Sequence, residues 1–204
     1  TGGDKLETCA LDFRLASTAI AYPTTQTRQI LLVLIEAGAS SKSWLEELLH
    51  GADDADRRAD LCSTYISLFD QGGRAASLVE TEHGHMRGIA KGRDLADVAA
   101  FYSAFGYSQR DDKEDCEALD HLSVELEFYA ILLAKEAFLV DAGDSEGVFV
   151  VHDARKKFLE DHLARIAAVA MRNPALAKNR LYAAILTSCH GMVEDECRQL
   201  GAKP

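Results

Sequence analysis

A histidine and three carboxylates stand at the head of an apolar helical pattern, in the stretch DHLSVELEF that ends at Phe128. The histidine is His121, and the carboxylates are Asp120, Glu125 and Glu127. Side chains of these types can act as general acids and bases, bind a metal ion, or pair with a cationic partner. They can equally be solvated or bonded to another helix of the chain, so the residue types alone leave these alternatives open.

The helical period places these side chains on different faces. With 3.6 residues per turn, His121 and Glu125 are four positions apart and share a face with Phe128, next to a leucine stripe. We therefore expect both polar side chains to lie against apolar surface and to interact with each other. We expect Asp120 and Glu127 on a more exposed side. A partly buried carboxylate needs a hydrogen-bond partner, which is either an internal group or a ligand.

A second group of ligand-type side chains lies in the glycine-rich segment 71–94. It contains Glu82, His83 and His85, and imidazole and carboxylate groups are common metal ligands. The alternative function is therefore a metal-binding helical protein or an enzyme that uses these three residues, or the pair His121 and Glu125.

Sequence motifs for chemistry are otherwise absent. The chain lacks the repeated Glu-x-x-His pattern of di-iron bundles. It also lacks the known signatures of nucleophilic catalysis, phosphate-binding loops and dinucleotide binding. We therefore expect no catalytic residues, no metal and no cofactor, and we interpret the polar groups as serving recognition.

The composition bounds the fold and the partners. Of the 204 residues, 48% are hydrophobic and 27% are charged, and only three are prolines, which favours an all-α helical bundle. A net charge of −11 disfavours nucleic acid and favours a basic ligand. Five widely spaced cysteines without a CxxC motif indicate reduced thiols and a cytoplasmic location. No signal segment is visible, and the longest apolar run, 30–35, is too short to span a membrane.

Helical periodicity interrupted by Gly, Pro and Asp clusters predicts the elements that position these groups. Ser43 is expected to cap a short helix, and Asp53 or Asp54 a longer one. The acidic segment 107–116 is the predicted hinge between an N-terminal helical part, 1–106, and a C-terminal helical part, 107–204. The expected helices cover roughly 6–21, 27–38, 43–51, 54–69, 94–106, 114–142, 148–171 and 174–200.

Five segments of the chain form a recognisable order, and they are LCSTYISLF (61–69), VETEHG (79–84), LADVAAFYSAFG (95–106), EALDHLSVELEF (117–128) and FLEDHLARI (158–166). Taken in this order, they resemble the TorD/DmsD/NarJ superfamily of redox-enzyme maturation chaperones. The segment VETEHG looks most like the YETEYG of the branch that serves dimethylsulfide-dehydrogenase, selenate, chlorate or ethylbenzene-type molybdoenzymes.

The resemblance implies an all-α, cytosolic chaperone without catalytic activity, in which a hinge joins the two helical parts. We expect it to be a monomer or a homodimer. Its partner would be the apo catalytic subunit of a molybdenum-bis(guanine dinucleotide) oxidoreductase, often bound through a twin-arginine signal peptide. It would assist cofactor insertion and delay export, without binding nucleic acid and without stable membrane association. Asp120 and His121 match the family's Asp-His pair, which lies in a region associated with signal-peptide binding.

A cationic leader followed by an apolar segment needs carboxylates beside an apolar wall. We expect acidic residues to supply charge, His121 to orient the ligand or sense protonation, and aromatic residues to form the wall. Ordinary core packing is the alternative for each aromatic residue. The predicted peptide-binding residues are Tyr65, Phe69, Glu80, Glu82, His83, Phe101, Tyr102, Asp120, His121, Glu125, Glu127 and Phe128.

Overall fold

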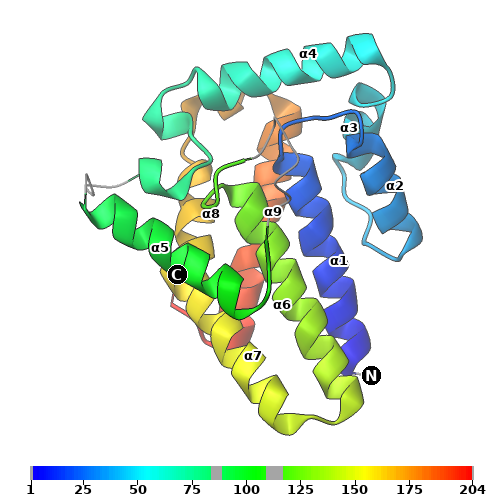
Figure 1. Cartoon of the computed structure of the whole chain (residues 1–204). Coiled ribbons are helices and arrows are strands. Elements are labelled where there is room, and N and C mark those ends of the chain that lie inside the picture. The colour runs from blue at the N-terminus through cyan, green and yellow to red at the C-terminus, as the bar shows by residue number, and fades with distance from the viewer. Residues whose placement is uncertain (1, 84–88, 109–116, 204) are drawn as a thin grey trace.

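A computed structural model describes residues 2–83, 89–108 and 117–203 (Figure 1). The described residues are mostly helical, as the composition predicts, and they contain no strand beyond one isolated β-bridge. The helices are α1 (Gly2–Ile20), α2 (Thr27–Glu36), α3 (Leu45–Gly51), α4 (Ala55–Tyr65), α5 (Ile89–Ala104), α6 (Leu122–Ala142), α7 (Ser145–Phe158), α8 (Ala164–Ala170) and α9 (Arg180–Leu200).

Short non-α helical turns connect several of these helices. Two of them are π-helical and continue the helix before them: Ile66–Asp70 follows α4, and Leu159–Leu163 joins α7 to α8. The other three are 3₁₀ turns, at Arg74–Ala76, Glu80–Glu82 and Pro174–Lys178.

The central helix is α6, which lies alongside α1 and forms an antiparallel hairpin with α7 (Figure 1). The helix α9 packs against α1 and α8, while α4 crosses one end of these long helices. Because α6 has neighbours on several sides, both stripes expected on it are buried. The apolar core joins side chains from both predicted parts of the chain, and the division at 106/107 stays a prediction.

A buried ionic network ties four of the long helices together. Arg155 of α7 donates from Nη1 to Glu136 of α6 at 2.6 Å and from Nη2 to Glu196 of α9. The Tyr129 hydroxyl of α6 donates to the same Glu196 carboxylate at 2.6 Å. The Cys9 thiol of α1 contacts the other oxygen of Glu196. All but Cys9 are nearly fully buried, so the network fixes the relative positions of these helices.

The structure tests the predicted caps and helix boundaries. The Asp54 cap is confirmed, because its Oδ1 accepts the Arg57 backbone N–H at 2.9 Å. The Ser43 cap is wrong, because α3 begins after Trp44 without a side-chain cap. The helix predicted to start near 114 begins at Leu122, with His121 as its N-cap. Of the predicted hinge 107–116, residues 109–116 lie outside the described part of the chain.

Candidate functional site

The segment before α6 pairs with the segment around Glu80 through the backbone. Val79 and His121 form the antiparallel bridge. The Leu122 N–H donates to the Leu78 carbonyl at 2.8 Å, and the Glu80 N–H donates to the Asp120 carbonyl at 2.9 Å. We call residues 78–81 and 120–122 the junction. It brings together two of the five segments on which the family resemblance rests.

Asp120 contributes its side chain to the same contact. Its Oδ2 accepts the Thr81 backbone N–H at 2.8 Å, and the residue is only 2% exposed. The expectation that Asp120 lies on an exposed side is therefore wrong. The reason is that Asp120 precedes the helix, so the helical period that was applied to it does not hold there.

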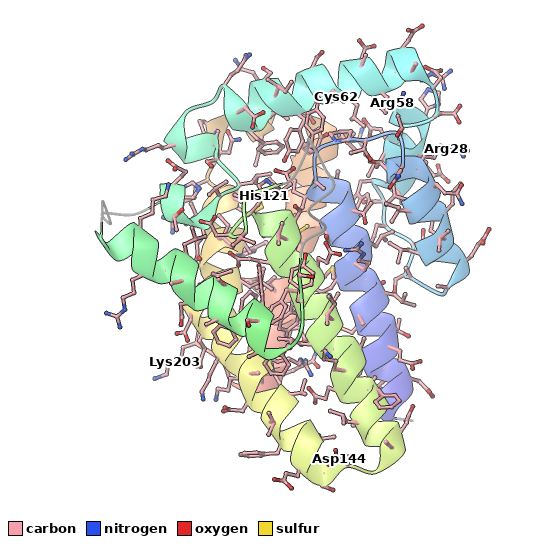
Figure 2. The ribbon with its side chains drawn as sticks, viewed as in Figure 1. Arg28, Arg58, Cys62, His121, Asp144 and Lys203 are labelled. Carbon is pink, nitrogen blue, oxygen red and sulfur yellow. The ribbon has the colours of Figure 1, made fainter. Side chains whose placement is uncertain are left out.

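His121 is the N-cap of α6 and is buried (Figure 2). Its Nδ1 accepts the Ser123 backbone N–H at 3.2 Å, which places the ring proton on Nε2, 3.2 Å from the Tyr65 hydroxyl. Burial lowers the pKa of His121, and this outweighs the opposing effect of the Glu117 carboxylate 3.7 Å away. A neutral imidazole therefore links the start of α6 to the end of α4.

Glu80 is the centre of an ionic cluster beneath the junction. Its carboxylate accepts from His162 Nδ1 at 3.1 Å and from Arg165 Nε at 2.7 Å. The other nitrogen of His162 lies 3.1 Å from Asp97 of α5. Burial alone would lower the pKa of His162, but its bonds to Glu80 and Asp97 outweigh burial and raise it. His162 thus favours the charged form. Through these two bonds it links α5 and the junction to the connection between α7 and α8.

Glu125 is fully buried, and neither of its carboxyl oxygens has a hydrogen-bond partner in the described structure. Burial, and then the nearby carboxylates of Glu80 and Asp120, raise its pKa well above the ordinary value. The side chain is therefore held as a neutral acid. The expected interaction between His121 and Glu125 is not observed, because the His121 ring is turned toward Tyr65 and Ser123 instead.

Most of the predicted aromatic wall belongs to the core. Tyr65, Phe69, Tyr102 and Phe128 are at most 4% exposed. The Tyr65 ring centroid is 5.0 Å from that of Phe69, and the Tyr102 centroid is 4.6 Å from that of Phe128. Phe101 alone keeps partial exposure. The rings hold the helices around the junction together, which is the packing alternative stated above.

Three polar residues of the predicted set keep contact with solvent. Glu127 is about 30% exposed and pairs with Arg14 of α1. Glu82 pairs with Lys91 at 2.5 Å, and this hydrogen bond lowers the pKa of its carboxyl. The ring of His83 bonds the Ser77 carbonyl at 2.6 Å.

The alternative metal site gains no support from the geometry. Between residues 2 and 83, 89 and 108, and 117 and 203, no group of three or more potential ligand side chains gathers in a way that could hold a metal ion. His85 lies outside the described residues. Within the same ranges, no helix is both long and apolar enough to cross a membrane.

Residues from all five segments of the family resemblance are bonded at this junction or next to it, Asp97 through His162. Tyr65 comes from the first segment, Glu80 from the second, Asp97 from the third, His121 from the fourth and His162 from the fifth. Sequence reasoning missed Asp97, His162 and Arg165, although FLEDHLARI was already part of the resemblance. His162 and Arg165 lie 82 and 85 residues after their partner Glu80. Asp97 lies 65 residues before its partner His162, so no local spacing could connect these residues.

Comparison with known proteins identifies the class to which this fold and junction belong. Residues 35–169 match the family described as nitrate reductase delta subunit, and the chain belongs to this family. Among the individual relatives, it is similar to the dimethyl sulfide dehydrogenase assembly chaperone protein of Rhodovulum sulfidophilum. The two are 30% identical over 94% of this chain and 80% of the relative.

Two further relatives carry similar names. The chlorate reductase assembly chaperone protein of Ideonella dechloratans is 33% identical over 74% of this chain and 76% of its own length. The nitrate reductase molybdenum cofactor assembly chaperone NarJ of Escherichia coli is 30% identical over 62% of this chain and 54% of its own length. These relatives are named as assembly chaperones and not as catalysts, and they confirm the predicted superfamily and branch.

Proposed function

We propose that this protein is a cytoplasmic, non-catalytic chaperone that binds the catalytic subunit of a molybdenum-containing oxidoreductase before its cofactor is inserted. The support is the membership of the family, and in particular the similarity to an assembly chaperone over 94% of the chain. The carrying observation is that the five dispersed segments on which the family resemblance rests are bonded together at one junction and around it. The buried polar groups of the junction bond to other segments of the chain and fix its shape, which suits a binding protein.

We also propose that recognition includes a basic leader on the client. The predicted peptide-binding residues then divide by burial. The half-buried members are available for direct contact, and they are Glu82, His83, Phe101 and Glu127. The buried members act by holding the junction that presents them. They are Tyr65, Phe69, Glu80, Tyr102, Asp120, His121, Glu125 and Phe128.

Co-expression with a candidate client tests the chaperone role. An affinity-tagged form of this protein is expressed with the catalytic subunit of a dimethyl sulfide dehydrogenase or chlorate reductase type enzyme. We expect the two chains to co-purify, and we expect less capture when the leader of the client is deleted. A client that never co-purifies, with or without its leader, would reject the proposed function.

A synthetic twin-arginine leader peptide tests the contact residues. We expect Glu82→Gln to weaken binding several-fold in calorimetry, because a carboxylate attracts a guanidinium and an amide does not. Glu46→Gln, an exposed site on α3, is the matched control and should bind as the unmodified protein does. Equal affinities for all three proteins would remove Glu82 from the contact surface.

A further inference from the structure

An apolar hollow of about 390 Å³ opens on the surface between α1 and α6. His121 and Asp144 lie at opposite ends of α6 (Figure 2). The hollow is distinct from the junction, because it lies along the middle of this helix, between residues 127 and 134. The residues that line it are Glu7, Ala10, Leu11, Arg14, Glu127, Ala130, Ile131 and Ala134.

The lining residues follow the helical period on both walls. On α6 they are spaced by three or four positions, and the next position on the same face is Phe138, whose side chain is 71% exposed. From Glu127 to Phe138 this face measures about 16 Å at 1.5 Å per residue. The hollow and Phe138 together form a largely apolar strip along α6 that is about three helical turns long. We call this strip the α1–α6 groove.

The floor of the groove consists largely of small side chains. The side chains of Ala10, Ala130 and Ala134 are too short to fill the space between the two helices at the surface. Small residues at these positions let another helix approach closely. The backbones of α1 and α6 are already bonded within their own helices, so an extended segment would find no partners for its N–H and C=O groups here. A helix satisfies its own backbone and therefore fits this surface better.

The charges at the rim select the sign of the occupant. Glu127 is paired with Arg14 at one end of the groove. Glu7 is exposed, and among the described residues no cation pairs with it. The rim therefore carries one uncompensated negative charge beside apolar surface. A helix with a lysine or arginine next to its apolar face complements this arrangement.

A second copy of the same chain fits the groove poorly. In a symmetric dimer, the same surface meets itself. Two hollows placed face to face leave a void, and Glu7 would approach the acidic rim of the other copy. Both effects disfavour self-association through this face.

We propose that the α1–α6 groove binds an apolar helix of about three turns from the client subunit, with a basic side chain of that helix facing Glu7. The occupant's origin in the client rests on the proposed function. The groove is a second contact surface that shares only Glu127 with the proposed leader contacts, and it would shield an apolar client helix until that helix can pack inside the folded client.

The test uses the full-length protein and a designed 16-residue helical peptide with leucine and alanine on one face and two arginines at one end. Ala134→Trp fills the groove at an exposed position, so the fold should tolerate it. Ala59→Trp, at an exposed position on the far helix α4, is the matched control. We expect Ala134→Trp to weaken peptide binding at least tenfold and Ala59→Trp to leave it unchanged. Thermal melts of both variants establish that they are folded.

A photocrosslinking amino acid at position 138 provides an independent readout, with position 149 on α7 as the exposed control. Crosslinks to the peptide from 138 and not from 149 support the groove. Equal binding by the two tryptophan variants, equal crosslinking from the two positions, or no binding of the peptide by the unmodified protein would overturn it. Co-purification of the client would persist in each of these cases if the proposed function holds, so the two failures are distinguishable.

Discussion

At the scale of single residues, the polar side chains that attract attention in the sequence are mostly buried. His121, Asp120 and Glu80 each satisfy hydrogen-bonding groups of other segments. Removing one partner of such a contact leaves the other buried and unsatisfied, which costs about 1–3 kcal/mol. Substitutions at these residues should therefore act on stability first and on binding through it.

Glu125 gives a prediction with a defined pH dependence. Below its ordinary pKa of 4.5 the carboxyl is protonated in both the folded and the unfolded chain. Above that value only the folded chain keeps the proton, because its pKa is raised, so the stability of the protein falls as pH rises, by up to about 1.4 kcal/mol per unit. Glu125→Gln replaces the carboxyl with an amide that does not titrate. Its stability relative to the unmodified protein should therefore increase between pH 5 and pH 8 in denaturant unfolding.

Glu127→Gln on the same helix is the control, because this side chain is partly exposed. Its effect on unfolding should be small, because a partly exposed ion pair contributes little to stability. A stability difference for Glu125→Gln that is the same at pH 5 and pH 8 would show that the buried carboxyl does not titrate as described.

The ionic network around Arg155 gives a second prediction. Arg155→Met leaves the buried Glu136 and Glu196 carboxylates without their guanidinium, and breaking a buried pair in this way costs about 3–5 kcal/mol. Arg198→Met, which loses an exposed ion pair with Asp195, should cost less than about 1 kcal/mol. Chemical denaturation of both variants measures the difference, and comparable losses would contradict the role assigned to the network.

At the scale of elements, helical periodicity predicted the bundle well because most helices have one apolar face and clear breakers. Asp54 is an example, since its cap depends only on neighbouring residues. The start of α6 was not predictable in this way. The helix does not begin before Leu122 because residues 119–120 form a turn, and the backbone of the segment bonds Leu78 and Glu80, which are remote in sequence. The prediction of the site was incomplete for the same reason. The burial of Asp120 and the pairing of His162 depend on contacts between residues that are far apart in sequence.

Glycines at helix ends and within helices should respond oppositely to alanine. Gly143 ends α6 with a φ of 72°, a conformation that costs an L-residue about 1 kcal/mol or more. Gly191 lies inside α9, and a Cβ there would meet nothing within 4 Å. Thermal unfolding should show Gly143→Ala to be destabilised and Gly191→Ala to be stabilised by roughly 0.5–1 kcal/mol. A shift of the same sign in both variants would contradict the assignment of Gly143 to the end of α6 and of Gly191 to the interior of α9.

At the scale of the whole molecule, a net charge of −11 and a core shared by the two predicted parts suit a stable receptor for basic segments. Exposed charges are screened over about 10 Å at 0.1 M salt and over shorter distances at higher concentrations. Affinity for a twin-arginine leader peptide should therefore fall steadily as salt is raised. An affinity that does not depend on salt would indicate a wholly apolar contact.

The metal content of a captured client tests the central claim most directly. After co-expression, client molecules bound to this protein are separated from unbound client, and molybdenum is measured per client polypeptide in each fraction. A chaperone that acts before cofactor insertion predicts bound client nearly free of molybdenum and unbound client that contains it. Equal molybdenum occupancy in the two fractions would contradict that claim.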